Sequence, residues 1–218
     1  MGDLIKLIVV LFVISTFAGL AIAFTSARTT PAIAAQLAAA KQEALKTVLP
    51  GCDRIEQRDG TAPLPETYWE GVRGETVVAW AFETAARGYS SDVKLMVSID
   101  TAGTIMGLTV IEQGETPGLG SRTQESISDK YVWNGLFAAE RKRPPWFSSQ
   151  FAGLSTARPI VIDRSGGEWH RMDETRKRAL TGANAVTAIT GATISTRAVV
   201  ACVEKKAAGW YQLLARPE

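Results

Sequence analysis

A short run of hydroxyl-bearing residues near the C-terminal end is the part of the sequence best suited to bind a phosphate. Residues 190–195 read Thr-Gly-Ala-Thr-Ile-Ser and directly precede a stretch with helical periodicity. The N–H groups and the dipole of a helix start attract phosphate, and Gly191 lets the backbone approach a ligand closely. Hydroxyl residues at a helix start are also common as plain N-caps, and the spacing alone favours that interpretation.

A glycine-rich loop is a second candidate site. Residues 115–120 read Glu-Thr-Pro-Gly-Leu-Gly and follow a predicted strand. Gly118 and Gly120 can expose backbone N–H groups toward a ring or a phosphate, although an ordinary Pro-Gly turn has the same composition. Ser121 and Gln124 fit a capping box, which predicts a short helix directly after the loop.

Metal and haem chemistry have little support in the sequence. The one histidine, His170, lies in a charged stretch where we expect it to be solvated, and Cys52 and Cys202 lack metal-ligand spacing. The two cysteines could pair in an oxidising compartment, but Cys202 on an apolar helix stripe is expected to be a buried small hydrophobe. A redox function would therefore rest on an organic cofactor, without a catalytic acid, base or metal ligand.

The composition is that of a folded chain without a nucleic-acid surface. Of the 218 residues, 46% are hydrophobic and 21% are charged, which excludes a disordered chain. The net charge of +2 gives no indication of nucleic-acid binding. The length suffices for one membrane segment and one domain with its own core.

An apolar segment near the start is long enough to cross a membrane. Residues 7–24 carry no charge, and about 18 residues at about 1.5 Å each give about 27 Å, close to the thickness of a bilayer's hydrocarbon core. Ala21-Ile22-Ala23 resembles a signal-peptide cleavage site, but the apolar stretch exceeds a usual signal core, so an uncleaved single-pass anchor is favoured. The short N-terminus and the long following domain predict an extracytoplasmic domain, with weak support from charge.

The rest of the chain predicts one α+β domain with a largely antiparallel sheet packed by helices. Thr30-Pro31 reads as an N-cap followed by proline at the first helical position, so a linker helix is expected up to about Leu49. The expected strands are residues 76–83, 93–100, 104–112 and 159–163. The first three are antiparallel because too few residues separate them for a crossover.

The remaining stretches complete this division of the chain. Residues 53–75 are polar and rich in turn formers, and no element is assigned to them. Residues 168–184 are expected to form a surface helix or loop, and residues 196–214 an amphipathic helix. We therefore expect three parts, namely a membrane anchor at 1–29, a linker helix at 30–52 and a domain at 53–218.

Two motifs together resemble a known family. Residues 186–200, VTAITGATISTRAVV, closely resemble the flavin-attachment segment of the FMN-binding domain in the G subunit of Rnf-type electron transport complexes and in the C subunit of sodium-pumping NADH:quinone oxidoreductases. Residues 115–120 are similar to the ETPGLG loop of the same domains, and Gly88-Tyr89-Ser90 before a strand also looks like the family pattern. The chain length is closer to that of the Rnf-type protein.

The resemblance implies a covalently bound FMN. The family motif reads roughly Asp-x-x-Ser/Thr-Gly-Ala-Thr, and its last threonine forms a phosphoester with FMN that a separate flavin transferase installs from FAD. Thr193 is then the acceptor, and Thr187 stands where the motif has Asp. The other residues expected to bind the cofactor are Thr190, Gly191, Ala192, Ser195, Glu115, Thr116, Gly118, Leu119 and Gly120.

The same resemblance implies an electron-transfer subunit of a membrane-bound, ion-translocating ferredoxin/NAD oxidoreductase complex. Its partners would be other membrane subunits, and its domain would lie on the periplasmic side of the inner membrane. Two alternatives stay open. A membrane-anchored assembly or binding module of the same fold without covalent flavin is motivated by Thr187. A stand-alone flavin reductase is the third interpretation.

Aromatic side chains add candidates without deciding between core and cofactor. Trp80, Trp133, Trp146 and Tyr89 could pack on a flavin, although aromatic residues in strands usually belong to the core. The basic and aromatic run at 141–147 is expected to contact either a partner subunit or solvent.

Overall fold

The computed structural model describes residues 2–60, 67–126, 144–165 and 167–214. Its contacts divide the chain into two compact units, Met1–Gln42 and Glu43–Glu218, which are treated separately below. Trp133 and the basic part of the basic and aromatic run, residues 141–143, lie outside the described residues. The aromatic end of that run, Trp146 and Phe147, is buried in the core rather than exposed to a partner or solvent as predicted. The three-part division at residues 29 and 52 stays a prediction.

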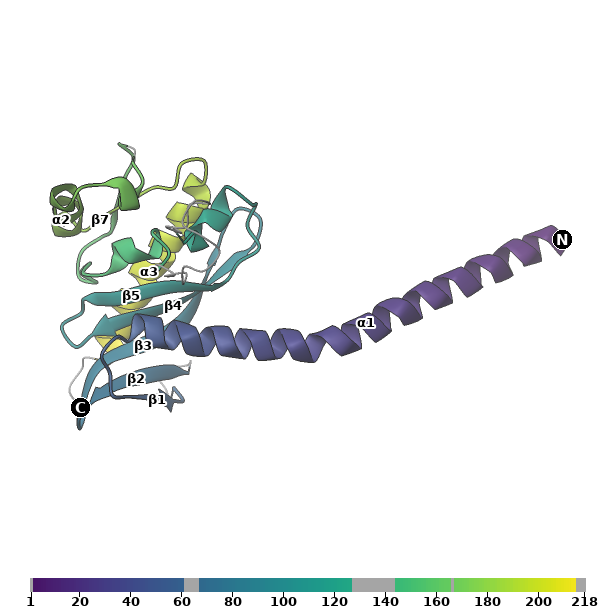
Figure 1. Cartoon of the computed structure of the whole chain (residues 1–218), viewed down its shortest axis with the longest axis horizontal. Helices are drawn as coiled ribbons and strands as arrows, with labels where there is room; N and C mark the ends of the chain where they lie inside the picture. Colours follow the sequence, from purple (N-terminus) through teal and green to yellow (C-terminus); the bar gives the residue numbers. More distant parts are fainter. Residues whose placement is uncertain (1, 61–66, 127–143, 166, 215–218) are drawn as a thin grey trace, which may run out of the picture. The chain divides into compact units, whose positions relative to one another are not determined.

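The first helix, α1, runs without interruption from Gly2 to Val48 (Figure 1). Its most apolar 18-residue window has a mean hydropathy of 2.7, so α1 is long and apolar enough to cross a membrane; a signal sequence near the N-terminus would meet the same criterion. The predicted helix start at Thr30 is wrong. The Thr30 hydroxyl donates back to the Ser26 carbonyl at 2.8 Å instead of capping a new helix, and Pro31 lies inside α1.

Five antiparallel strands form the main sheet, in the order β1-β2-β3-β4-β5 (Figure 1). Their bounds are Arg54–Arg58 for β1, Tyr68–Arg73 for β2, Thr76–Arg87 for β3, Asp92–Asp100 for β4 and Ile105–Glu112 for β5. The antiparallel pairing of the three predicted central strands is confirmed. The polar stretch left unassigned contains β1 and β2, and β3 runs four residues beyond its predicted end at Glu83.

A second, parallel pair of strands leads into the last helix. Strand β6, Val161–Asp163, pairs with β7, Ala185–Thr187. Between them lie a 3-10 turn, η4 (Trp169–Arg171), and the short helix α2 (Glu174–Gly182), which Asp173 caps by accepting from the Arg176 N–H at 2.6 Å. The long helix α3 follows at Thr193–Leu214 and begins three residues before its predicted start.

In the second unit, apolar side chains from helices pack on both faces of the sheet. Strand alternation directs Phe82 toward α3, where its ring stacks on Trp210 at a centroid distance of 5.2 Å. On the opposite face Ala81 and Met96 pack against the last turns of α1, where Leu45 is buried. The sheet between two helical layers is therefore a rigid platform for the loops at its end.

Two buried side-chain contacts fix the approach to α3. Asn184, at φ 54°, donates from its amide to the carbonyls of Arg158 (2.9 Å) and Pro159 (3.1 Å). Three residues later Thr187, 1% exposed, donates both its N–H (2.6 Å) and its hydroxyl (2.8 Å) to Oε1 of Gln150. Gln150 belongs to the 3-10 turn η3 (Ser148–Phe151), so β7 is tied to a separate part of the domain before α3 starts.

We predict that Gly107→Ala destabilises the domain because α1 leaves no room for a Cβ at this position. A Cβ at Gly107 would lie 3.0 Å from Cα of Val48, so backbone must shift. We expect a loss of about 1–3 kcal/mol, seen as a lower midpoint of thermal unfolding followed by tryptophan fluorescence. Gly209→Ala in α3 is the matched control, since nothing lies within 4 Å of its Cβ position. An unchanged midpoint for Gly107→Ala would contradict the packing.

Candidate functional site

A cavity of about 350 Å³ lies where the start of α3 meets two loops at the end of the sheet. Its lining residues are Tyr89, Glu115, Thr116, Leu119, Gly120, Gly191, Ala192, Thr193, Ile194 and Ser195. The structure thus brings eight of the ten predicted cofactor residues together; Thr190 and Gly118 do not line the cavity. Tyr89 and Ile194 join them, and both side chains are exposed.

The turn before α3 lies close to the ETPGLG loop. Gly191 has φ 79°, a left-handed conformation that suits glycine, and a Cβ there would meet Cδ2 of Leu119 at 3.0 Å. Ala192 is buried, and its N–H donates to the Ile189 carbonyl at 3.0 Å. The backbone at 191–193 therefore turns sharply against Leu119 and starts α3 at the wall of the cavity.

The four hydroxyls of this segment have different environments. Thr196 Oγ1 is buried; it donates to the Ala192 carbonyl (3.0 Å) and accepts from the Ile189 N–H (3.1 Å). Ser195 Oγ is buried and donates to Glu115 at 2.5 Å. Thr190 and Thr193 are exposed, and of these two only Thr193 lines the cavity. Thr193 is thus the one exposed hydroxyl of the segment that faces the cavity.

Glu115 is the centre of a hydrogen-bond network that joins three segments. Its carboxylate, in a side chain only 5% exposed, accepts from the N–H groups of Tyr89 (3.2 Å), Ser90 (3.0 Å) and Ser91 (3.0 Å) as well as from the Ser195 hydroxyl. Successive backbone N–H groups of this kind form an anion-binding concavity. Here the chain's own carboxylate occupies it.

Two glycines make room for that carboxylate. A Cβ at Gly88 would lie 2.5 Å from Oε1 of Glu115, and one at Gly120 would overlap its Oε2. The sequence pattern assigned Glu115 and Ser195 to cofactor binding, whereas in the structure their side chains are hydrogen-bonded to each other. No local signal could reveal this pairing, because the two residues are 80 positions apart.

Hydrogen bonding keeps Glu115 ionised despite its burial. Burial alone raises the pKa of the carboxyl, but the hydroxyl of Ser195 and the N–H groups of Ser91, Ser90 and Tyr89 outweigh it and lower the pKa from 4.5 to about 2. The cavity therefore has a permanent negative charge on its wall across the physiological pH range.

The loop after Glu115 is a compact turn rather than the start of a capped helix. Gly118, at φ 76°, donates its N–H to the Ser121 hydroxyl at 3.0 Å, and the Leu119 N–H donates to the Thr116 carbonyl at 3.1 Å. The predicted capping box is wrong: a short 3-10 turn, η1 (Gly120–Gln124), does follow, but its N-cap position is Leu119, and Ser121 lies inside the turn, where its hydroxyl accepts from the Gly118 N–H.

The other candidate residues belong elsewhere. His170 is not solvated as predicted but half-buried, with its ring centroid 5.7 Å from that of Trp146. Cys52 and Cys202 are both free thiols, so the disulfide alternative is not formed; Cys202 is half-buried, with Sγ 3.2 Å from the Thr84 hydroxyl. Trp80 and Trp146 pack with the core, which leaves Tyr89 as the aromatic residue at the cavity among the described residues.

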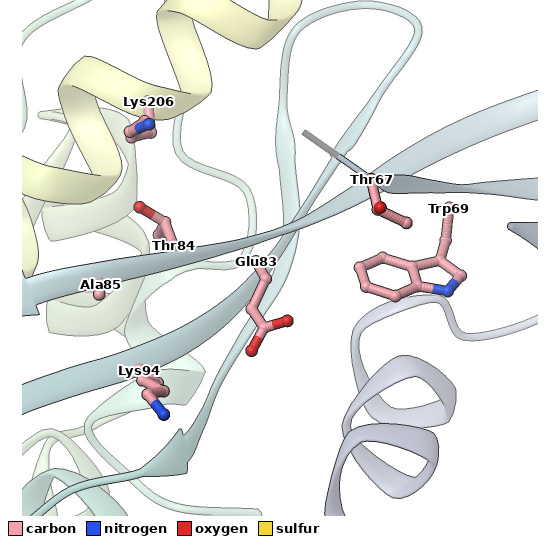
Figure 2. A pocket seen from close by; sticks show the side chains of 7 residues that line it. All are labelled: Thr67, Trp69, Glu83, Thr84, Ala85, Lys94 and Lys206. Carbon is pink, nitrogen blue, oxygen red and sulfur yellow. The ribbon is translucent and has the colours of Figure 1, made fainter. Parts of the chain in front are cut away.

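A larger hollow of about 580 Å³ lies beside β3 and contains none of the predicted site residues. Figure 2 shows Thr84 pointing toward Lys206 while its neighbour Glu83 points the other way, as alternation along a strand requires. Lys94, at the same hollow, is exposed enough to form a surface ion pair with Glu112 at 2.7 Å. Size alone therefore does not identify the functional cavity.

We predict that Glu115→Gln removes stability in a pH-dependent way. Because the folded pKa lies below the ordinary value of 4.5, ionised Glu115 contributes fully above about pH 4.5, and the contribution is lost as pH falls toward about 2. A shift of this size corresponds to about 3 kcal/mol. The unfolding free energies of wild type and variant, measured by chemical denaturation, should converge over that window.

The control for this experiment is Glu112→Gln, which removes an exposed carboxylate at the end of β5. It should change stability by less than about 1 kcal/mol at neutral pH, as is usual for a surface ion pair. A Glu115→Gln deficit that stays constant down to pH 2 would contradict the assigned ionisation.

The sequence matches the family model of the FMN-binding domain over residues 88–208. It is 30% identical over 213 residues to the G subunit of the Na⁺-translocating ferredoxin:NAD⁺ oxidoreductase complex of Acetobacterium woodii, covering 91% of this chain and 87% of the relative. It is 32% identical over 151 residues to the G subunit of the ion-translocating oxidoreductase complex of Cronobacter sakazakii, covering 69% of this chain but spanning 57% of that relative.

A structural comparison gives a weaker likeness. The crystal structure of Shewanella oneidensis NqrC aligns with a TM-score of 0.47 and 15% identity, covering 78% of this chain and 73% of the other. The matched residues 88–208 include every residue that lines the cavity, so FMN is the ligand that the family match supports for it. This chain belongs to the FMN-binding-domain family and, within it, to the G subunits of ion-translocating oxidoreductase complexes.

Proposed function

We propose that this chain is an electron-transfer subunit of a membrane-bound, ion-translocating ferredoxin/NAD oxidoreductase complex and carries FMN esterified to Thr193. The observation that carries the proposal is the environment of Thr193. Within residues 190–196 its hydroxyl is the exposed one at the cavity wall, whereas Ser195 and Thr196 are buried and hydrogen-bonded and Thr190 does not line the cavity. The exposed Thr116 also lines the cavity, but it lies outside the segment that resembles the attachment motif. This environment supports Thr193 as the acceptor among the four hydroxyls of the segment.

The residues around the cavity fit a flavin. Tyr89, Leu119 and Ile194 are exposed apolar or aromatic side chains at its wall, which suits the faces of an isoalloxazine ring. The first N–H groups of α3, beginning at Thr193, have no intrahelical partners and suit a phosphate. When bound, the flavin supplies the redox chemistry; the chain holds its phosphate end, packs its ring and limits access of water.

The attachment would be a group transfer without net oxidation. The Thr193 hydroxyl oxygen forms a bond to the FMN phosphorus of FAD, the anhydride bond to AMP breaks, AMP leaves and the hydroxyl proton goes to solvent or to a base of the transferase. The resemblance to the family's attachment motif supports this route. The ester leaves the isoalloxazine ring unmodified.

The departure from the family motif at Thr187 is compatible with covalent flavin. Thr187 is buried, lies outside the cavity lining and binds Gln150 through both its N–H and its hydroxyl. Its function in this chain is to hold the end of β7, from which the backbone reaches Thr193. The alternative of a binding module without covalent flavin therefore becomes an outcome of the adduct experiment below.

Complex membership and location rest on the relatives and on α1. Both named relatives are G subunits of oxidoreductase complexes, which supports other membrane subunits as partners of this chain. A helix long and apolar enough to span a bilayer supports membrane attachment, with the FMN domain on the extracytoplasmic side. We do not favour the stand-alone reductase, which activity of the isolated chain with a soluble electron donor would support.

We predict that Thr193→Val abolishes the flavin adduct. The full chain, co-expressed with a flavin transferase, should gain the mass of FMN less one water and give a fluorescent band on a denaturing gel, because the ester survives unfolding. Thr101→Val is the matched control, the same change of side chain at an exposed position outside the motif and the cavity, and should keep the adduct at wild-type yield. An adduct that persists in Thr193→Val, or no adduct in wild type, would overturn the assignment.

We predict that a reporter fused after residue 218 lies outside the cytoplasm. Alkaline phosphatase at that position should be active, and a fluorescent protein that matures only in the cytoplasm should stay dark. The reverse pattern would place the domain in the cytoplasm and exclude the proposed topology.

A further inference from the structure

The cavity has an unusual charge for a site that receives a phosphate. Among the described residues that line it, Glu115 has the only ionisable acidic or basic side chain apart from the phenol of Tyr89, and Glu115 is an acid. Phosphate sites usually contain Arg or Lys, whose charge offsets that of the phosphate. Here the favourable groups are the N–H dipoles at the start of α3 and neutral hydroxyls, opposed by one full negative charge.

That negative charge is close to the attachment point. The Ser195 hydroxyl, two residues after Thr193 in the first turn of α3, is 2.5 Å from Oε2 of Glu115. The carboxylate is buried, so solvent screens it less than a surface charge. Its three N–H partners belong to residues 89–91, so they solvate the carboxylate and are not available to a ligand phosphate.

The two forms of the phosphate differ in charge. A free phosphate monoester such as FMN carries about −1.5 to −2 near pH 7, because its second pKa is about 6. Once esterified to a threonine hydroxyl it is a diester with a single negative charge. A fixed anion on the cavity wall therefore repels free FMN more strongly than attached FMN.

We propose that Glu115 is a specificity-determining residue that disfavours reversible binding of free FMN, so that the site retains the cofactor through the covalent bond rather than through phosphate affinity. This inference deepens the proposed function and rests on the FMN assignment. Riboflavin has the same ring as FMN but no phosphate. The charge of Glu115 should therefore weaken binding of riboflavin to the unmodified chain less than binding of FMN. The difference between the two ligands isolates the charge from the shape of the cavity.

The test compares both flavins on the full chain made without a flavin transferase and kept in detergent. Binding of FMN and of riboflavin is titrated by flavin fluorescence for wild type, Glu115→Gln and Glu112→Gln. Glutamine keeps an oxygen for the N–H groups of Ser90 and Ser91 while it removes the charge. Glu112 is an exposed carboxylate outside the cavity and serves as the charge-matched control.

We expect wild type to bind riboflavin at least as tightly as FMN, and Glu115→Gln to raise the FMN affinity relative to riboflavin about tenfold, as the loss of one nearby charge implies. Glu112→Gln should leave the ratio unchanged. Equal effects of Glu115→Gln on both flavins, a wild type that clearly prefers FMN, or no measurable riboflavin binding by wild type would each overturn the proposal.

A salt titration of wild type tests the same idea without any variant. Because the carboxylate is buried, added salt screens the repulsion only in part, so the affinity for FMN relative to riboflavin should rise slightly with ionic strength; a fall would indicate attraction to a cation and would overturn the proposal. The adduct at Thr193 is measured separately. Its presence together with a failed flavin comparison would reject the role of Glu115 alone, whereas its absence would reject the covalent function itself.

Discussion

The buried carboxylate of Glu115 is the contact on which the shape of the cavity depends. It is the point where the turn after β3, the loop after β5 and the first turn of α3 meet. Burying a charge is unfavourable unless hydrogen bonds replace its hydration, and here three N–H groups and a hydroxyl do so. Removing the carboxylate would leave these donors without their acceptor. The relative positions of the three segments therefore depend on this one side chain.

The sheet makes this meeting point possible. Antiparallel pairing brings the turn at 88–91 and the end of β5 to the same end of the sheet. Helix α3 packs on one face of the sheet, where Trp210 stacks on Phe82 of β3. The tie between Thr187 and Gln150 fixes the strand that delivers the backbone to α3. An exposed threonine can thus be held at a defined place by contacts that do not involve its own side chain.

The sequence predicted those parts of the molecule that depend on local pattern. Short apolar runs joined by turn residues identified the central strands, and two short motifs identified nearly all of the cavity wall. Strand β1 was missed because its side chains are mostly polar at a sheet edge, where little is buried. The helix start at Thr30 was wrong because a threonine hydroxyl can bond back within a helix as readily as it caps one. The pairing of Ser195 with Glu115 needed the tertiary structure, since no local rule relates such distant residues.

The use of backbone donors around Glu115 affects how the family can diverge. Any residue other than proline at positions 90 and 91 supplies the same N–H group, so a substitution there keeps both backbone donors to Glu115 and removes only a serine hydroxyl 3.5 Å from the carboxylate. Gly88 and Gly120 have no such latitude, since a Cβ at either would enter the space of the carboxylate. Evolution can therefore reshape the outer surface of this loop, and with it the recognition of neighbouring proteins, while the interior of the site is inherited through the main chain.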